Sequence, residues 1–210
     1  MNRKEHWQHV YQTKDKDPTD VSWFQSQPTL SFQLIRNAGL KSNQSVIDVG
    51  GGASVLAGCL LSAGFQHVAV LDISADALKH AKQRLGARAD AVEWFEADVT
   101  DLMPPHRFDL WHDRAVFHFL TDKTDRQKYV QTLKRSLAPN GHVIIATFAI
   151  GGPPKCSGLD VCRYDAAGIS AEFGVGFELR EQVNETHVTP WNTEQKFSYF
   201  RFARKENNTL

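Results

Sequence analysis

Residues 46–54 read VIDVGGGAS, in which an acidic residue stands two positions before the first of three successive glycines. A second acidic residue, Asp72, ends the next apolar run, twenty positions after Gly52. A glycine turn between a strand and a helix lets a ligand reach the backbone, and a carboxylate at about this distance can accept hydrogen bonds from ribose hydroxyls. The spacing therefore predicts a nucleoside-binding βαβ unit.

Apolar runs alternate with amphipathic segments through the middle of the chain. Expected strands lie at 45–49, 67–72, 91–97, 108–111 and 142–148, and expected helices at 55–63, 75–84 and 125–137, with residues 139–141 as a turn. This alternation predicts a mostly parallel sheet with helices on both faces, and extended runs at 177–188 and 196–203 predict a C-terminal antiparallel hairpin. The fold class is α/β.

The chain is expected to form one domain over residues 1–210 with three functional parts. Residues 1–27 are polar and carry several aromatic side chains, so they form either a lid over a cofactor or an anchored arm. Residues 45–148 form the cofactor-binding core. Residues 149–210 supply an acceptor-side loop and the terminal hairpin.

Charge and composition exclude several classes of partner. The 24 Lys and Arg residues balance 24 Asp and Glu residues, which gives no overall attraction to nucleic acid or to an anionic membrane. The apolar run at 143–150 is too short to cross a bilayer, and the first residues lack the apolar core of a signal peptide. The three cysteines have no metal-binding spacing. A cytoplasmic protein without a metal site is expected.

The residues around the glycines favour a particular cofactor. A dinucleotide site usually has a further glycine where Val55 stands here. Asp48, directly before the glycines, would repel a pyrophosphate but would suit a cationic aminoacyl sulfonium. These residues favour S-adenosylmethionine over NAD. Asp98, at the end of the third strand, could accept a hydrogen bond from the adenine amino group.

In this order, over about residues 45–148, these features resemble the class I S-adenosylmethionine-dependent methyltransferases. The resemblance implies a Rossmann-like sheet of seven strands with a reversed last strand, and S-adenosylhomocysteine as the product. Ser54 departs from the pattern, since many members have another glycine there. The cofactor contacts that we expect are Asp48, Gly50, Gly51 and Gly52 at the methionine end, Asp72 and Ile73 at the ribose, Asp98 and Val99 at the adenine, and His112 and Trp23.

The segment after the fourth expected strand is the best candidate for catalytic groups. Ligands of open α/β sheets bind beyond the carboxyl ends of the strands, and Asp113, Arg114 and His118 follow residue 111. Asp113 could bind the amino group of the donor, and His118 could take a proton from the acceptor. Equally, Asp113 and Arg114 could form a structural ion pair, and His118 could belong to the core.

The irregular loop at 151–164 is expected to form the acceptor pocket. Arg163 could clamp a carboxylate or phosphate, Tyr164 could stack or hydrogen-bond, and Cys156 could act as a soft ligand, or could simply be buried. His187, beside the hairpin turn, could assist deprotonation or form a cross-strand hydrogen bond. The predicted catalytic residues are Asp113, His118, Tyr164 and His187, and the predicted substrate contacts are Arg114, Cys156 and Arg163.

The predicted activity is methyl transfer to a small-molecule acceptor by in-line attack on the sulfonium methyl. A protein-lysine methyltransferase is the first alternative. A nicotinamide-dependent oxidoreductase and a non-catalytic cofactor-binding protein are the others. The neutral charge disfavours nucleic acid as the substrate, as does Asp113-Arg114-Ala115-Val116 in place of an Asn/Asp-Pro-Pro-Tyr/Phe motif.

Overall fold

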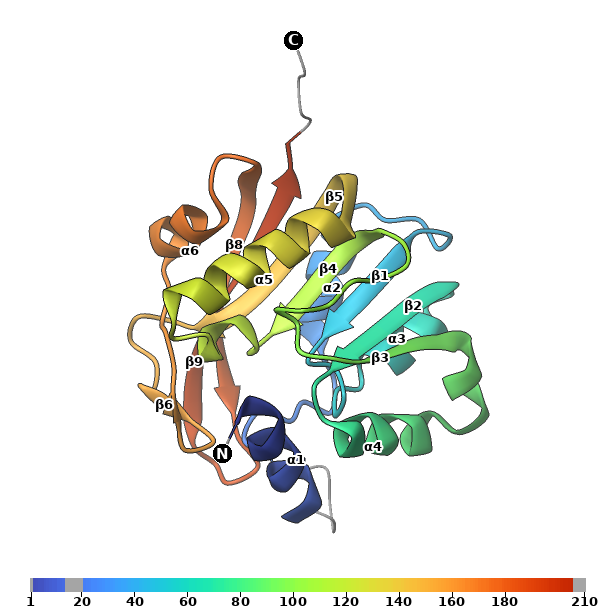
Figure 1. Ribbon diagram of the computed structural model, residues 1–210, viewed down its shortest axis with the longest axis horizontal. Coiled ribbons are helices and arrows are strands. Elements are labelled where there is room, and N and C mark those ends of the chain that lie inside the picture. Colours follow the sequence, from blue (N-terminus) through green and yellow to red (C-terminus); the bar gives the residue numbers. More distant parts are fainter. Residues whose placement is uncertain (1, 14–20, 206–210) are drawn as a thin grey trace.

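A seven-stranded sheet runs through the centre of the computed structural model, which describes residues 2–13 and 21–205 (Figure 1). In spatial order the strands are β3-β2-β1-β4-β5-β9-β8. The first five are parallel, and β9 is antiparallel to both β5 and β8. The predicted α/β class and terminal hairpin are confirmed. The strands are β1 (Ser45–Val49), β2 (His67–Asp72), β3 (Val92–Glu96), β4 (Phe108–Arg114), β5 (Leu137–Phe148), β8 (Phe177–Val188) and β9 (Glu194–Arg204).

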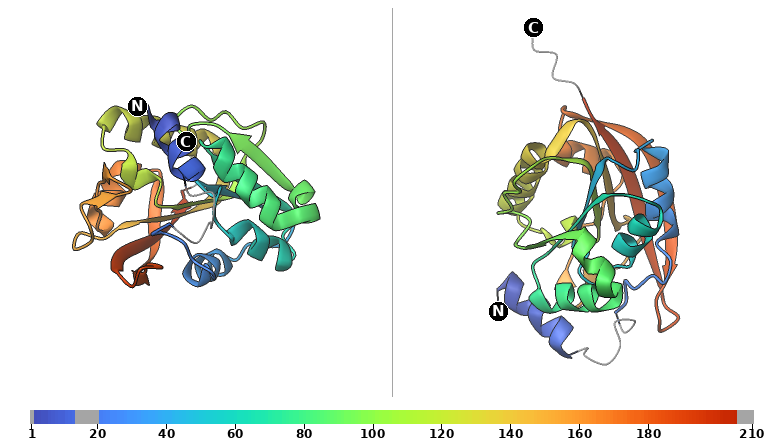
Figure 2. Two further views of the ribbon diagram at one scale, coloured as in Figure 1. Left: turned by 90° about the horizontal axis from the view of Figure 1, so that it is seen from below. Right: turned by 90° about the vertical axis from the view of Figure 1, so that its right-hand side faces the viewer.

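Helices cover both faces of the sheet, as the alternating sequence pattern predicts. The right-hand view of Figure 2 shows α5 and α2 on opposite sides of the sheet. Since successive strand residues point to opposite faces, Ile47 of β1 packs into the core on the α5 side, and Val46 packs into the core with α2 and α3. The helices are α1 (Arg3–Thr13), α2 (Thr29–Asn37), α3 (Leu56–Ser62), α4 (Ala75–Leu85), α5 (Lys123–Ser136) and α6 (Ala166–Phe173).

Local sequence signals explain where several helices begin. The Ser74 hydroxyl accepts a hydrogen bond from the Ala77 amide, Asp122 caps α5 through the Thr124 amide, and Asp165 caps α6 through the Gly168 amide. No helix among the described residues combines the length and apolarity needed to cross a membrane. Sequence analysis did not identify α6, although Asp165 and Gly174, which has a positive φ of 75°, mark its two ends.

Two strands, β4 and β5, extend at least three residues beyond their expected limits. β4 continues to Arg114 instead of ending at residue 111, because it pairs with β1 and β5 along its whole length. β5 begins at Leu137, and the expected turn at 139–141 lies inside it as a bulge: Phe108 pairs with Leu137, but Leu110 pairs with His142. Asn140 has a φ of 60°, a value that asparagine tolerates better than most residues.

The irregular loop at 151–164 contains a short hairpin of β6 (Lys155–Cys156) and β7 (Leu159–Asp160). Ser157 and Gly158 join the two strands, and both have positive φ, as a two-residue hairpin turn of type I′ requires. In the N-terminal part, the sequence pattern did not predict helix α1. It lies against α4, at the carboxyl end of the parallel strands (Figure 1).

Candidate cofactor and active site

Two adjoining cavities lie at the carboxyl ends of the parallel strands. The larger has about 740 Å³ of empty space and the smaller about 510 Å³, in both cases including open solvent at the mouth. Asp72 and Asp98 line the larger cavity, and Asp48 and His112 line the smaller. Both cavities are lined by Trp23, Val49, Gly50 and Arg114, which therefore mark the place where they meet.

The glycine loop between β1 and α3 has no room for side chains. Gly50 has a φ of 69°, and a Cβ added there would collide with the Val116 side chain. At Gly52 a Cβ would lie 2.5 Å from Ala77 Cβ and 2.6 Å from an oxygen of Asp72. The loop can thus present bare backbone to a ligand, which is the property for which glycine is needed there.

Asp72 ends β2 and faces the larger cavity beside Ile73. One carboxylate oxygen accepts the Gly52 amide at 3.0 Å, and the other accepts the Ser74 amide at 2.9 Å. Burial raises the pKa of Asp72 to about 6, against the lowering effect of these hydrogen bonds. The charged carboxylate has further lone pairs, which fit the two hydroxyls of a ribose.

Asp48 and His112 form a buried pair in the smaller cavity. His112 Nδ1 donates to one oxygen of Asp48 at 2.7 Å, and His112 Nε2 lies 2.9 Å from the Ser31 hydroxyl. The other oxygen of Asp48 has no hydrogen-bond partner among the described residues. A buried carboxylate oxygen in this state is costly unless a ligand satisfies it, and the ammonium group of a methionyl moiety has the right charge. The carboxylate also packs against Gly51, where a Cβ would collide with it.

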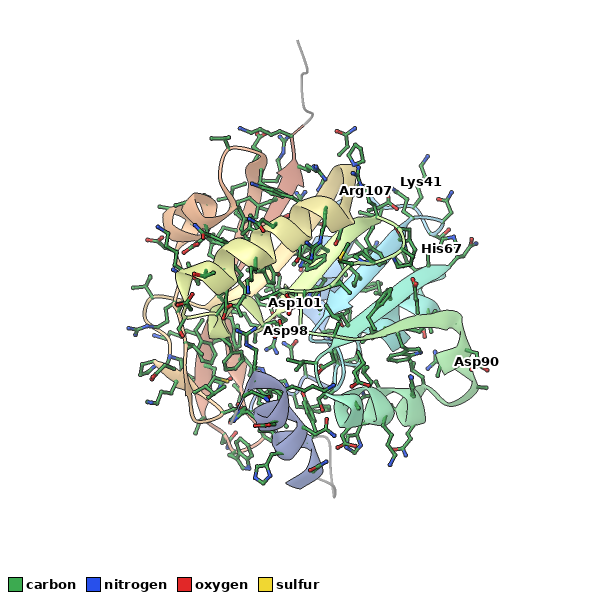
Figure 3. All side chains as sticks on the ribbon, in the orientation of Figure 1. Lys41, His67, Asp90, Asp98, Asp101 and Arg107 are labelled. Atoms are coloured by element: carbon green, nitrogen blue, oxygen red, sulfur yellow. The ribbon has the colours of Figure 1, made fainter. Side chains whose placement is uncertain are left out.

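Asp98 and Val99 line the larger cavity, as predicted for the adenine end. However, the Asp98 carboxylate already accepts Arg3 of α1 at 2.8 and 3.1 Å, together with the amide and hydroxyl of Thr100. Figure 3 shows Asp98 near α1, whereas Lys41, His67 and Arg107 lie at the opposite end of the sheet. Asp98 therefore anchors α1, a role that the sequence did not indicate.

Helix α1 forms one wall of the larger cavity. Arg3, Trp7 and Tyr11 line the cavity, and the Trp7 ring packs edge-on against Trp23 and Phe119, with centroids 5.8 and 4.9 Å apart. Burial raises the pKa of the Tyr11 phenol well above its usual range. The N-terminal segment lines the cavity in the structure, a position that fits both the lid and the anchored arm. Residues 14–20, which join its two described parts, lie outside the described residues.

The structure does not bring Asp113 to either cavity. Its carboxylate is fully buried and accepts the Val116 amide at 2.8 Å, the Phe117 amide at 3.1 Å and the Tyr129 hydroxyl at 2.6 Å. Because β4 extends to Arg114, Asp113 points to the α5 side, opposite to its neighbours. The structure therefore does not support the expected contact with the donor, and it gives Asp113 a structural role in the core. Burial raises its pKa to about 6.

Three further predicted residues lie away from the cavities. His118 is fully buried and accepts the Phe148 amide at 3.4 Å, and burial lowers its pKa to about 3. Tyr164 packs in the core against Phe117, and burial raises the pKa of its phenol. Arg163 is exposed and donates to the Gly152 carbonyl at 3.2 Å. The expected roles of His118 and Tyr164 in proton transfer and of Arg163 in substrate binding are not supported, because none of them faces a cavity.

Cys156, Arg114 and His187 lie nearer to the site. Cys156 is 5% exposed and lines the larger cavity, as predicted. Arg114 lines both cavities, but its NH1 donates to the Trp23 carbonyl at 2.8 Å. His187 Nε2 donates to the Ser22 carbonyl at 2.8 Å and is not part of the wall of either cavity. Sequence analysis missed Arg3, Trp7, Tyr11 and Phe119 as lining residues, although the spacing of Trp7 and Tyr11 places them on one helical face.

Comparisons with known proteins agree with this geometry. Residues 46–141 match a family model described as a methyltransferase domain. A curated relative from Mus musculus, "eEF1A lysine and N-terminal methyltransferase", is 26% identical over 202 residues. That match covers 95% of this chain but only 28% of the relative, so the chain spans little more than a quarter of that protein's length.

Solved structures show the same fold. One, described as "Conversion of a Disulfide Bond into a Thioacetal Group during Echinomycin Biosynthesis", superposes with a TM-score of 0.78 at 20% identity, covering 99% of this chain and 94% of that one. A second is the Burkholderia thailandensis 1,6-didemethyltoxoflavin-N1-methyltransferase with bound 1,6-didemethyltoxoflavin and S-adenosylhomocysteine. Its TM-score is 0.73 at 17% identity, with 97% and 87% of the two chains covered.

The residues present fit the cofactor of these proteins. The glycine loop leaves space for a ligand, Asp72 offers a carboxylate to a ribose, and the unpartnered oxygen of Asp48 offers one to an ammonium group. The predicted cofactor, S-adenosylmethionine, therefore fits these residues. The nucleoside and amino-acid ends of S-adenosylmethionine differ in chemistry in the same way as the two cavities. Residues 46–141 thus match a methyltransferase domain, and the chain has the fold of S-adenosylmethionine-dependent methyltransferases.

Proposed function

We propose that this enzyme transfers the methyl group of S-adenosylmethionine to a small-molecule acceptor by in-line attack on the sulfonium methyl. The observation that carries the proposal is the pair of adjoining cavities at the strand ends. One offers Asp72 to a nucleoside, the other offers Asp48 to an amino acid, and they meet at Gly50 and Trp23.

The residues divide the work of binding. Asp48, held by His112, binds the ammonium group, and Asp72 binds the ribose hydroxyls. Ile73 and Val99 flank the adenine. When bound, the cofactor supplies an electrophilic methyl group, and the protein contributes alignment of the acceptor and exclusion of water. Trp7, Trp23 and Phe119 serve this exclusion, because their rings pack together over the larger cavity.

The covered cavity favours a small acceptor. Its walls include four aromatic side chains, those of Trp7, Tyr11, Trp23 and Phe119, and α1 supplies the first two of them. Arg3 ties α1 to both Asp98 and Asp125, which fixes this cover to the sheet. The Burkholderia thailandensis N1-methyltransferase, which has the same fold, binds a small molecule, 1,6-didemethyltoxoflavin, together with S-adenosylhomocysteine. Cys156, on the short β6–β7 hairpin, is the candidate acceptor contact from the C-terminal part.

A specific observation favours methylation of a protein lysine as the second candidate. The curated relative that matches over 95% of this chain is named for methylation of eEF1A lysine and of an N-terminus. A lysine side chain could enter the larger cavity only through its mouth, with the rest of the protein outside. The two candidates therefore differ in the size of the molecule that becomes labelled.

Two measurements test the proposal in order. Calorimetric titration with S-adenosylmethionine and S-adenosylhomocysteine, with NADH as a control, tests the cofactor; binding of NADH alone would contradict the proposal and restore the oxidoreductase alternative. Incubation with methyl-labelled donor and a cell extract, separated by size, then tests the acceptor. Label in the small-molecule fraction supports the proposal. Label on protein lysine supports the second candidate, and donor binding without any labelling would indicate a non-catalytic protein.

A further inference from the structure

A short segment between α1 and α2 crosses the site where the two cavities meet. We call residues 21–25 the strap. Its Trp23 is the only strap residue that lines both cavities, among the residues that the structure describes. A ligand with a nucleoside at one end and an amino acid at the other has its central atoms at this junction. The indole of Trp23 is therefore placed beside the part of the donor that carries the sulfonium charge.

The strap is held from the C-terminal half of the chain. The Ser22 carbonyl accepts His187 Nε2 at 2.8 Å, and the Trp23 carbonyl accepts Arg114 NH1 at 2.8 Å. The Gln25 amide group donates to Glu185 at 3.1 Å. Two of these three contacts are made to the backbone, so Arg114 and His187 fix the path of the chain on either side of the Trp23 side chain.

Arg114 is itself held rigidly. Its Nε donates to the Tyr199 hydroxyl at 2.8 Å, and its guanidinium lies 4.5 Å from the centre of the Phe197 ring. Its NH2 lies 3.8 Å from a carboxylate oxygen of Glu185, which also accepts the Tyr199 hydroxyl. The side chain is 10% exposed. Strands β4, β8 and β9 thus meet at one guanidinium, and its planar shape allows it to serve several acceptors at once.

Direct contact between Arg114 and the sulfonium of the donor would be unfavourable, because a guanidinium repels that cation. Arg114 donates from Nε to Tyr199 and from NH1 to the Trp23 carbonyl, while its NH2, which has no hydrogen-bond partner among the described residues, pairs with Glu185 at 3.8 Å. The face of an indole attracts a cation, by contrast, and tryptophan is the best of the aromatic side chains for this contact. The arrangement separates the two tasks: Arg114 holds the strap, and Trp23 meets the cation.

We infer that Arg114 and His187 are positioning residues, which hold the strap so that Trp23 contacts the sulfonium of the bound donor. The inference rests on the proposed function, since it requires S-adenosylmethionine in the two cavities. It assigns Arg114 and His187 roles that differ from substrate binding and proton transfer. It also makes the C-terminal hairpin part of the donor site, although the hairpin lies far from the glycine loop in the sequence.

The test compares two ligands that differ in charge. S-adenosylmethionine carries the sulfonium, and S-adenosylhomocysteine is a neutral thioether of nearly the same shape. A cation–π contact at this site favours the first by a factor of about 3 to 10. We expect Trp23→Leu to lower the ratio of the Kd for S-adenosylhomocysteine to the Kd for S-adenosylmethionine by that factor. Arg114→Lys and His187→Phe should also lower this ratio.

Arg114→Lys keeps the positive charge but cannot serve Trp23, Tyr199 and Glu185 together. A role for Arg114 through charge alone therefore predicts an unchanged ratio, and a merely structural role predicts equal losses for both ligands. Combining Arg114→Lys with Trp23→Leu should lower the ratio no further than Trp23→Leu alone, since both changes remove the same contact.

Arg201→Lys is the matched control. Arg201 lies on the same hairpin, is 14% exposed and pairs with Glu181 at 3.0 Å. Its variant should keep the wild-type ratio. Should wild-type protein bind neither adenosyl compound, the proposed function itself fails. If wild-type protein binds both adenosyl compounds while Arg114→Lys and His187→Phe leave the ratio unchanged, the positioning inference is overturned. If Arg114→Lys does not fold, the result for His187→Phe alone decides.

Discussion

Replacement of Asp72 by Asn should weaken cofactor binding and remove its dependence on pH. Both oxygens of Asp72 accept backbone amides in the structure, from Gly52 and Ser74. An asparagine amide group would place an N–H donor against one of these amides, and it offers fewer lone pairs to a ribose. Hydrogen bonds to a charged group contribute about 1.5–3 kcal/mol, so the Kd for S-adenosylhomocysteine should rise roughly 10- to 150-fold.

The pH dependence follows from the raised pKa of Asp72, which burial moves from 3.8 to about 6. Ribose hydroxyls donate to the charged form, so binding lowers this pKa, and affinity is full above pH 6 and falls as the pH drops through 6. At pH 5 the wild-type Kd should be about tenfold higher than at pH 8. For folding, the sign is opposite, since the stability that Asp72 contributes is greatest below pH 3.8 and is lost as the pH rises through 6.

Calorimetric titration at pH 5, 6, 7 and 8 measures both effects. Asp109→Asn is the control, because Asp109 also accepts a backbone amide, from Ser45 at 2.8 Å, but at the amino ends of β1 and β4. That variant should bind the cofactor with unchanged affinity. The reasoning is refuted if Asp72→Asn keeps the wild-type Kd, or if the wild-type Kd is the same at pH 5 and pH 8.

Three further predictions concern the loop and the core. Gly52→Ala should abolish measurable cofactor binding, whereas Gly151→Ala, where a Cβ meets nothing within 4 Å, should bind normally in the same titration. Tyr129→Phe should lower the free energy of unfolding by about 1–3 kcal/mol in urea, since it deprives buried Asp113 of a donor, and should leave cofactor affinity unchanged. Because burial lowers the pKa of His118 to about 3, the neutral form is native, and stability is lost as the pH falls below 6.5. The loss in free energy of unfolding should reach about 2 kcal/mol at pH 5 and should be absent in His118→Leu. Equal shifts of the urea midpoint in both proteins would contradict this prediction.

The cofactor-binding half of the site could be predicted because its chemistry is local in sequence. Asp48 and Gly50 belong to one strand and the turn that follows it, and Asp72 ends the next strand along the chain. Parallel strands place their carboxyl ends at one edge, so identifying the strands is enough to bring these residues together. Among the predicted cofactor contacts, Asp48, Gly50, Asp72 and Ile73 line a cavity, whereas Gly51 and Gly52 are in the wall of neither.

The structure supports the predicted catalytic residues less well than the predicted cofactor contacts, for a physical reason. A strand that continues for three more residues turns alternate side chains to opposite faces, and the limits of β4 depend on its pairing with β1 and β5. Asp113 consequently points into the core, and His112 points toward Asp48. No local pattern in residues 108–119 fixes where the strand ends.

The sequence by itself determined the α/β class, the cofactor and the glycine loop, because hydrophobic periodicity and short-range spacing are properties of neighbouring residues. Only the tertiary structure decided what covers the cofactor. Arg3 meets Asp98 across 95 positions, and Arg114 meets the Trp23 carbonyl across 91. Such contacts depend on where whole elements pack, and the same guanidinium could have paired with many other acceptors until β9 and the strap were placed around it.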